Sequence, residues 1–276
     1  MKPRLRFFLL LLLLTLTFGA LAFAQRGYWR RQRMIDPNVL DRRGVPDWEN
    51  DREFKDDVFT FVRIRYTSRY DNYQWGKWAI DWPDSDLNFP YRLHELTSLD
   101  VSPEPRILSL TDDELLDYPF AYLIEPGHMT LTEEEVAGLR RYLLNGGFLM
   151  VDDFWGEQEW QEFYINIKRV FPDREPVELP LEHPIFHCVY DLKQKPQVPS
   201  IGHWRSGMTT ERWDAPEPHY RALFDDKGRM MAIICHNTDL GDGWEQEGED
   251  PGYFREMSEK WAYPLGINIV TYAMTH

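Results

Sequence analysis

Residues 120–160 read FAYLIEPGHMTLTEEEVAGLRRYLLNGGFLMVDDFWGEQEW, and this stretch decides the fold. Two short apolar runs, at 121–124 and 148–151, flank a segment whose apolar residues recur with helical spacing. A strand, a helix and a strand in that order predict two parallel strands joined by a right-handed crossover. Neither run alternates polar with apolar residues, as expected for parallel strands that are buried on both faces.

The sequence also marks the ends of the predicted helix. Thr132, followed three residues later by Glu135, predicts a capping box, in which each side chain bonds the backbone N–H of the other residue. Asn145 and the two glycines after it predict the C-terminal end of the helix. Asp152 and Asp153 then close the second apolar run.

Further elements are predicted on either side of this unit: strands at 58–66 and 106–110, helices at 86–96 and 157–170, a β-hairpin at 220–235, and a C-terminal helix from 253 that breaks at Pro264. Two stretches lack periodicity and are predicted to be an irregular insert (176–218) and an acidic loop (236–252). Strands that alternate with helices predict an open, mostly parallel α/β sheet with helices on both faces, as in flavodoxin-like folds.

The first 24 residues have the pattern of an export signal. Lys2, Arg4 and Arg6 precede an apolar core at 7–14, and Ala22-Phe23-Ala24 is a small-x-small cleavage site. The apolar core is shorter than the roughly 20 residues that a spanning helix needs, with an uncleaved anchor as the alternative. We therefore predict an exported protein, in the periplasm or on the outer face of the inner membrane, with no transmembrane span after cleavage.

Composition bounds the domain count and the partners. The 276 residues carry a formal net charge of −15, and loss of residues 1–24 with their three basic side chains would change it to −18. Such a charge disfavours nucleic acid and simple adhesion to anionic lipid as partners. Residues 25–57 are predicted to be a flexible arm or tether, and 58–276 a single α/β domain. Cys188 and Cys235 permit one disulfide in an exported protein, with two separate thiols as the alternative.

Ligands of open α/β sheets bind beyond the carboxyl ends of the strands. In this chain that rule selects three places, at 125–128, 152–156 and 236–244. The candidate ligand-binding residues are Trp78, Asp81, His128, Asp152, Asp239 and Trp244. The candidate catalytic residues are His128, Asp152, Asp153 and Asp239.

Each candidate also has a purely structural alternative. Asp152 and Asp153 could bind a metal or act as acid and base, although successive strand residues point to opposite sides, so only one of the two would face the site. Their alternative role is to cap the helix that follows. His128 could carry protons or simply bond the backbone. The aromatic residues between 70 and 82 could stack on sugars or pack the loop itself. The sequence predicts neither a metal-ligand set nor a cofactor.

Several short motifs, in this order along the chain, resemble a bacterial family catalogued as domain of unknown function 4159. The motifs are Trp78 with Asp81, PGH at 126–128, RRYLLNGGFLMVD at 140–152, LEHPIF at 181–186, NTDL at 237–240 with Trp244, and GINIV at 266–270. The resemblance extends from residue 58 to the end and implies a class I glutamine-amidotransferase-like fold. It also implies an association with envelope proteins that carry von Willebrand A domains and with AAA ATPases of the MoxR type. No activity comes with this resemblance.

Amidotransferases of that fold carry a nucleophilic Cys on a sharp elbow between a strand and a helix. Here VDDFWG at 151–156 takes the place of the elbow, and it contains neither Cys nor Ser. Without a thiolate or an activated hydroxyl an acyl-enzyme has no starting atom, so glutaminase activity is not expected. The leading hypothesis is a non-catalytic binding or assembly module of the cell envelope. The alternatives are a hydrolase of glycans or peptides that uses Asp152, Asp153 and His128, with or without a metal, and a rigid spacer.

Overall fold

The structure is a computed structural model that describes residues 40–50, 57–69 and 76–276. The predicted signal at 1–24, and the part of the predicted arm up to residue 39, lie outside the described residues. Within the part of the chain that the structure describes, no helix is both long enough and apolar enough to cross a bilayer.

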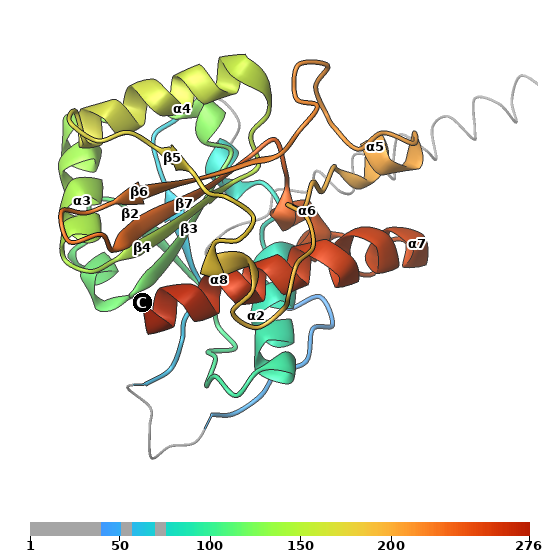
Figure 1. Cartoon of the computed structure of the whole chain (residues 1–276). Coiled ribbons are helices and arrows are strands. Elements are labelled where there is room, and N and C mark those ends of the chain that lie inside the picture. Colours follow the sequence, from blue (N-terminus) through green and yellow to red (C-terminus); the bar gives the residue numbers. More distant parts are fainter. Residues whose placement is uncertain (1–39, 51–56, 70–75) are drawn as a thin grey trace, which may run out of the picture. The chain divides into compact units, whose positions relative to one another are not determined.

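Seven strands of the described chain form one sheet, in the order β2-β1-β3-β4-β7-β6-β5 (Figure 1). Their bounds are β1 Val62–Arg65, β2 Arg106–Ser109, β3 Phe120–Ile124, β4 Phe148–Asp152, β5 Val177–Glu178, β6 His219–Phe224 and β7 Met230–His236. Strands β2, β1, β3, β4 and β7 pair in parallel, whereas β6 and β5 are added antiparallel at one side. The predicted open, mostly parallel sheet is therefore confirmed, and its parallel part has the flavodoxin-like order.

Helices cover both faces of the sheet, with α3 and α4 on one face and α2, α6 and α8 on the other (Figure 1). The α-helices are α2 Asp84–Leu96, α3 Glu133–Leu144, α4 Gly156–Val170, α5 Ile201–Arg205, α6 Leu240–Glu245, α7 Pro251–Tyr253 and α8 Tyr263–Thr275. The short 3₁₀ turns are η2 Lys77–Ala79, η3 Asp113–Asp117, η4 Pro126–His128 and η5 Pro184–Phe186. A π-helical stretch, η6 Phe254–Ala262, joins α7 to α8.

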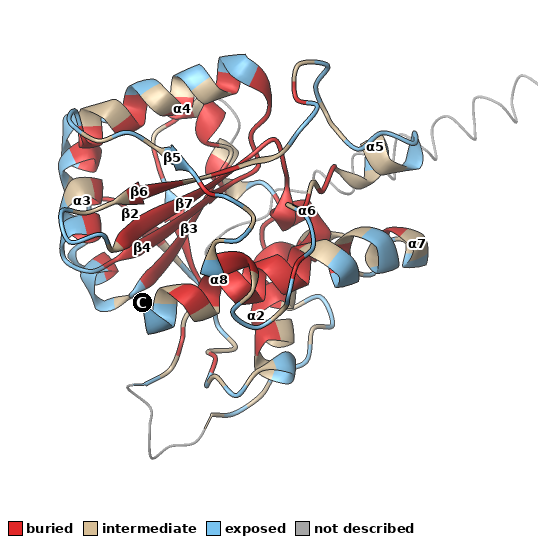
Figure 2. Ribbon diagram, in the orientation of Figure 1, coloured by how far each residue is buried: buried red, intermediate tan, exposed pale blue. Residues whose placement is uncertain are grey.

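The sequence of β3 explains why the sheet is covered twice. Phe120 and Tyr122 belong to the core cluster that includes α2, α6 and α8, whereas Ala121 and Leu123 belong to the cluster under α3 and α4. All residues of β3 are buried, and the central strands in Figure 2 are buried along their whole length. An apolar run without alternation thus reflects apolar contacts on both faces of the sheet.

The strand–helix–strand unit at 120–152 is formed as predicted. β3 and β4 pair in parallel around α3, and Thr132 and Glu135 make both hydrogen bonds of the capping box. The predicted hairpin at 220–235 is also confirmed, because β6 and β7 pair antiparallel.

Three predictions about the C-terminal half are wrong in detail. The supposed acidic loop contains α6, which Asp239 caps through a hydrogen bond that its Oδ1 accepts from the backbone N–H of Asp242 (2.7 Å). The irregular insert contributes β5 to the sheet. The last helix does not break at Pro264: the chain stays helical across this residue, which follows the change from the π-helical η6 to α8.

Two further segments bear on the predicted domain plan. Within the predicted arm, Trp48 stacks on His94 at 4.8 Å and donates a hydrogen bond from Nε1 to the carbonyl of Val101 (2.7 Å).

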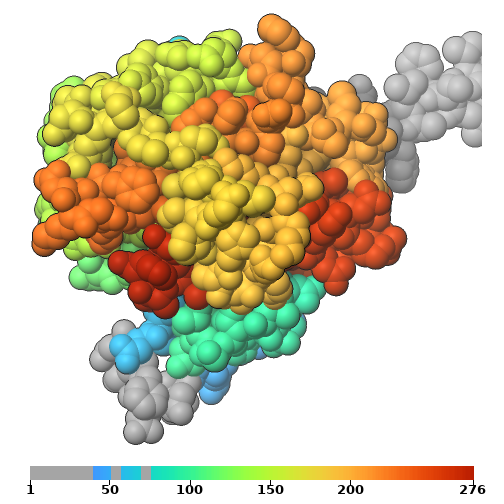
Figure 3. All heavy atoms as spheres, viewed as in Figure 1, coloured from blue at the N-terminus to red at the C-terminus, as the bar shows by residue number. Residues whose placement is uncertain are grey.

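Cys188 is exposed, Cys235 is buried, and both are free thiols. The insert after α4, in yellow to orange, spreads over the face of the molecule that is visible in Figure 3.

Candidate functional site

The carboxyl ends of three neighbouring strands carry residues with a left-handed backbone. Glu125 after β3 has φ 53°, Asp153 after β4 has φ 53°, and Asn237 after β7 has φ 61°. Such angles are uncommon for residues other than glycine, and they cluster at functional sites. The carboxyl edge of the sheet, which the sequence selected, is therefore also where the backbone is most constrained.

Asp153 occupies the turn between β4 and α4, and β7 holds that turn in place. The backbone N–H of Asn237 donates to the carbonyl of Phe154, and the Asn237 side chain accepts from the N–H of Gly156, both at 2.9 Å. Trp155 is the N-cap of α4 and its side chain makes no capping hydrogen bond; the first two N–H groups of the helix donate instead to the side chains of Asn237 and Asp214. The alternative role of Asp152 and Asp153 as caps of the following helix is therefore wrong.

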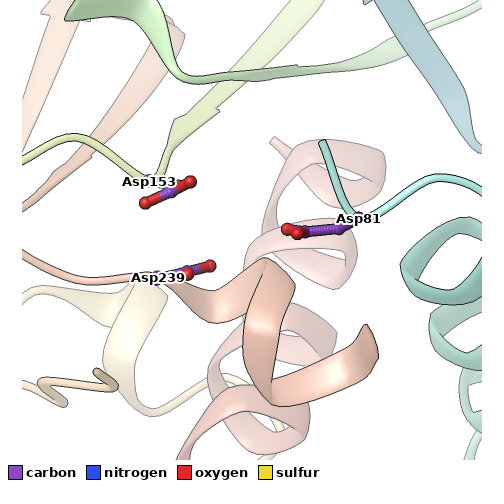
Figure 4. Close-up of side chains that lie close together, drawn as sticks. All are labelled: Asp81, Asp153 and Asp239. Carbon is purple, nitrogen blue, oxygen red and sulfur yellow. The ribbon is translucent and has the colours of Figure 1, made fainter. Parts of the chain in front are cut away.

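Asp81, Asp153 and Asp239 bring their carboxylates together, and we call these three residues the aspartate cluster. One oxygen from each side chain lies within 4.8 Å of the others, and the three carboxylates point toward one another in Figure 4. They come from the segment before α2, the turn after β4 and the N-cap of α6. Their exposed fractions are 9%, 8% and 4%, so the cluster is almost fully enclosed.

The cluster is held mainly by hydrogen bonds to the chain around it. Asp153 Oδ1 accepts from the indole Nε1 of Trp155 (3.2 Å), and Asp239 Oδ1 accepts from the Asp242 N–H. Asp81 is positioned through its neighbours, because the buried Arg63 donates to the carbonyls of Trp78 and Ile80, each at 2.9 Å. Asp81 Oδ2, by contrast, is enclosed and has no hydrogen-bond partner among the described residues.

Burial and mutual repulsion shift the acidity of all three carboxyls. Loss of hydration raises the pKa of Asp81, of Asp153 and of Asp239 well above its ordinary value. Neighbouring carboxylates raise each pKa further, and for Asp81 the guanidinium of Arg63 offsets only part of this effect. The charged form of each carboxyl is therefore disfavoured where no positive charge compensates it.

Asp152 is not a member of the aspartate cluster, and it ties β4 to α6. Its Oδ2 accepts from the N–H groups of Leu240 (2.9 Å) and Gly241 (3.0 Å) and from the hydroxyl of Tyr122 (3.1 Å). Asp152 is fully buried, and burial raises its pKa to about 7. Of the two adjacent aspartates only Asp153 belongs to the cluster; it follows the end of β4 with a left-handed backbone, so strand alternation does not set the direction of its side chain.

His128 lies at the same edge, beside Glu125. Its Nε2 lies 3.2 Å from Glu125 Oε2, and Lys77 Nζ lies 2.7 Å from the other oxygen of Glu125. Burial alone would lower the pKa of Lys77, but the charges of Glu125 and Asp153 outweigh it and raise that pKa. No sequence pattern indicated Lys77 as a candidate residue, because it belongs to a loop without periodicity.

Trp78 and Trp244, which the sequence placed among the ligand-binding residues, are part of the hydrophobic core. Trp244 is fully buried and stacks on Phe89 with ring centroids 4.2 Å apart. Trp78 is 4% exposed. Both indoles are covered by neighbouring apolar groups, so neither lines an accessible site in this structure.

A polar pocket of about 410 Å³ opens at the same edge, and we call it the edge pocket. It is lined by Arg69 after β1, Gly127 and His128 after β3, the first turns of α4, and residues 212–214 of the insert. Its two arginines form ion pairs, Arg69 with Glu162 and Arg212 with Glu159. Trp213, at the pocket, is 93% exposed, which is exceptional for a tryptophan. No local sequence pattern in the insert predicted that residues 212–214 line this pocket.

The fold and this edge define a class of protein, an open, mostly parallel α/β protein with carboxylates gathered where its strands end. The family described as Domain of unknown function (DUF4159) matches residues 60–274, and the chain belongs to this family. The family membership indicated by the short motifs is thereby confirmed, whereas the amidotransferase-like fold that it implies stays a prediction. Comparison with curated proteins finds no match.

Proposed function

We propose that this protein is an exported binding module of the bacterial cell envelope, and that it holds a neutral glycan in the edge pocket without covalent catalysis. The export signal pattern at 1–24 supports the location, either the periplasm or the outer face of the inner membrane. The observation that carries the proposal is the exposed indole of Trp213 beside a pocket whose arginines are paired.

The position of the edge pocket supports a binding role. In the strand order of this sheet, β1 pairs with β2 on one side and β3 on the other, so the chain reverses direction across the sheet at β1 and β3. Ligands of open α/β sheets bind in the crevice at such a reversal. Arg69 follows β1 and His128 follows β3, which places the edge pocket at this reversal.

The chemistry of the pocket favours a sugar over an ion. Arg69 is paired with Glu162, and Arg212 with Glu159, so the charges cancel within each pair. Neither arginine therefore offers an unpaired charge to an anionic ligand. The remaining polar groups suit hydroxyls, which both donate and accept hydrogen bonds. An exposed indole provides a flat apolar surface for the C–H face of a sugar ring.

The elbow supports binding without a covalent intermediate. Asp153 stands at the strained turn between β4 and α4, with Asp152, Phe154 and Trp155 beside it. None of these side chains is a thiol or an aliphatic hydroxyl, so this turn supplies no nucleophile of the amidotransferase kind. A partner of the von Willebrand A or MoxR type, which the resemblance implies, remains a further part of this proposal.

The test is isothermal titration of the full chain with neutral oligosaccharides, using the N-acetylglucosamine tetramer and maltotetraose as probes. We expect at least one probe to bind, and Trp213→Ala to weaken that binding by about tenfold or more. Leu144→Ala is the matched control, because Leu144 is also an exposed apolar residue (53%) and does not line the pocket. If Trp213→Ala binds as tightly as the unchanged protein, or if no probe binds, the glycan proposal fails.

Hydrolysis of an envelope glycan or peptide is a second candidate function. The observation that favours it is the close approach of Asp153 and Asp239, whose oxygens lie within 4.8 Å of one another. Retaining glycosidases hold two carboxyls about 5 Å apart. Mass spectrometry of polymers incubated with the protein would detect new chain ends, and Asp153→Asn should abolish them. Products formed equally by that variant would exclude this role for Asp153.

A further inference from the structure

We propose that the aspartate cluster binds one hard divalent cation, of the Ca²⁺, Mg²⁺ or Mn²⁺ class, through Asp81, Asp153 and Asp239. This site is distinct from the edge pocket, and the proposal does not depend on glycan binding. It rests on the spacing of the oxygens, on one buried oxygen without a partner, and on the way the surrounding charges are balanced.

The spacing of the three carboxylates suits a shared ion. Their oxygens lie within 4.8 Å of one another. Oxygen ligands stand about 2.0–2.6 Å from such cations, so two oxygens on one ion are separated by at most about twice that distance. The carboxylates approach from three different segments and point into the same space (Figure 4).

The second observation is Asp81 Oδ2. Asp81 is 9% exposed, and this oxygen is fully enclosed without any hydrogen-bond partner among the described residues. A buried carboxylate oxygen without a partner is costly, so such groups call for an explanation, which an unplaced ion can supply. Asp81 also has a left-handed backbone (φ 65°), which aims its side chain toward the other two carboxylates (Figure 4).

Gly241 keeps space open beside these oxygens. A Cβ atom built on Gly241 would lie 2.7 Å from Asp81 Oδ2 and 3.3 Å from Asp239 Oδ1. The first distance is too short for any ordinary contact, so a larger residue would displace Asp81. Glycine at the first turn of α6 therefore preserves the arrangement of two of the proposed ligands.

The basic side chains near the aspartate cluster, Arg63 and Lys77, already bond other groups. The charge of Arg63 acts on Asp81, but the donors of its guanidinium are taken by Asp86, Ser85 and backbone carbonyls. Lys77 forms its ion pair with Glu125. An external cation is therefore the natural partner for three carboxylates that these side chains leave largely unneutralised.

A neighbouring acidic group makes a useful contrast. Asp242 and Glu245 could form a second set with Asp81. The side chains of Asp242 and Glu245 are joined by a hydrogen bond. Among the described residues, no such hydrogen bond joins the members of the aspartate cluster.

Cation binding can be measured directly on the full chain after treatment with EDTA and removal of the chelator. We would titrate it with CaCl₂, MgCl₂ and MnCl₂ by calorimetry, and with Tb³⁺ by luminescence excited through tryptophan. We expect one ion per chain, a higher Tm in its presence, and binding weakened at least about tenfold by Asp81→Asn or by Gly241→Ala. Asp113→Asn is the control, because the Asp113 side chain is 88% exposed and lies outside the cluster.

The variants also exclude misfolding as an explanation. Asp81→Asn removes one of three repelling charges, so without cations it should melt at a Tm no lower than that of the unchanged protein. A folded Asp81→Asn variant that binds the ions as tightly as Asp113→Asn would overturn the proposal. So would the absence of binding by all three salts at millimolar concentration in the unchanged protein.

Discussion

Asp81 and Asp86 are buried aspartates of the same short segment, but their charged neighbours have opposite signs. Asp86 is fully buried and bonds the guanidinium of Arg63, which is also fully buried. Asp81 meets the carboxylates of Asp153 and Asp239 and leaves one oxygen without a partner. Arg63 thus bonds Asp86 in α2, whereas Asp81 has no ion pair among the described residues and feels Arg63 only at a distance. The difference indicates that Asp86 serves the fold, whereas Asp81 is kept for a ligand.

Breaking the neutralised pair should have the largest effect. Arg63→Met leaves the Asp86 carboxylate buried and unpaired, so we expect the free energy of unfolding to fall by about 3–5 kcal/mol. Urea unfolding followed by circular dichroism measures this change. Arg65→Met, on the same strand but exposed and, among the described residues, hydrogen-bonded to Ser109 alone, should cost less than about 1 kcal/mol. Equal losses in the two variants would refute the distinction.

A buried histidine should produce the next largest effect, and it depends on pH. His236 is 5% exposed, and burial lowers its pKa from 6.5 to about 4. Between pH 6.5 and pH 4 the imidazole of this histidine binds a proton in the unfolded chain but stays neutral in the folded protein. The stabilising contribution of neutral His236 is therefore complete above pH 6.5 and is lost, by about 3 kcal/mol, as the pH falls to 4.

Urea unfolding at several pH values checks this prediction. His236 faces Arg221, His219 and Glu178, and its Nε2 bonds the Gly156 carbonyl, so His236→Gln can keep a hydrogen bond there. The stability of His236→Gln should fall less steeply between pH 6.5 and 4 than that of the unchanged protein. His276→Gln, at an exposed position, should follow the unchanged protein. Parallel curves for all three proteins would count against a neutral buried His236.

Removing one charge from the aspartate cluster should have a smaller and opposite effect. Asp153→Asn keeps an oxygen for the Trp155 indole and relieves repulsion, so without cations the free energy of unfolding should rise by about 1 kcal/mol. Thermal melts in EDTA and in CaCl₂ measure the change. CaCl₂ should raise the Tm of the unchanged protein and leave the Tm of the variant unaltered. A variant that is less stable in EDTA would show that the three charges do not repel one another as described.

The smallest effect is expected at the edge pocket. Trp213→Ala removes a side chain that is 93% exposed, so stability should change by no more than about 0.5 kcal/mol. Differential scanning calorimetry on that variant measures this. A large loss would mean that the indole packs on the protein in solution, which would weaken the case for sugar stacking.

Local patterns were enough to predict the frame of the molecule and many members of the site. The capping box of Thr132 and the apolar runs of β3 and β4 depend on residues that are close in sequence. The rule that ligands meet strand ends then led to Asp153 and Asp239, while Asp81 entered through the motifs of the resemblance. All three members of the aspartate cluster are therefore candidates that the sequence alone supports.

What sequence patterns missed depends on contacts between distant segments. Asp152 bonds the start of α6, which is too short to give a clear periodicity. Trp244 was expected at the edge, but its large apolar ring gains more by stacking on Phe89 in the core. The roles of Arg63 and Trp213 likewise follow from what surrounds them in space, which no local pattern records.

The most direct test of the central claim is a crystal structure of the full chain grown with MnCl₂, with anomalous scattering used to locate the metal. We predict one strong peak about 2.0–2.6 Å from oxygens of Asp81, Asp153 and Asp239. A map with no anomalous peak between these carboxylates, or with manganese bound only at other acidic side chains, would contradict the account.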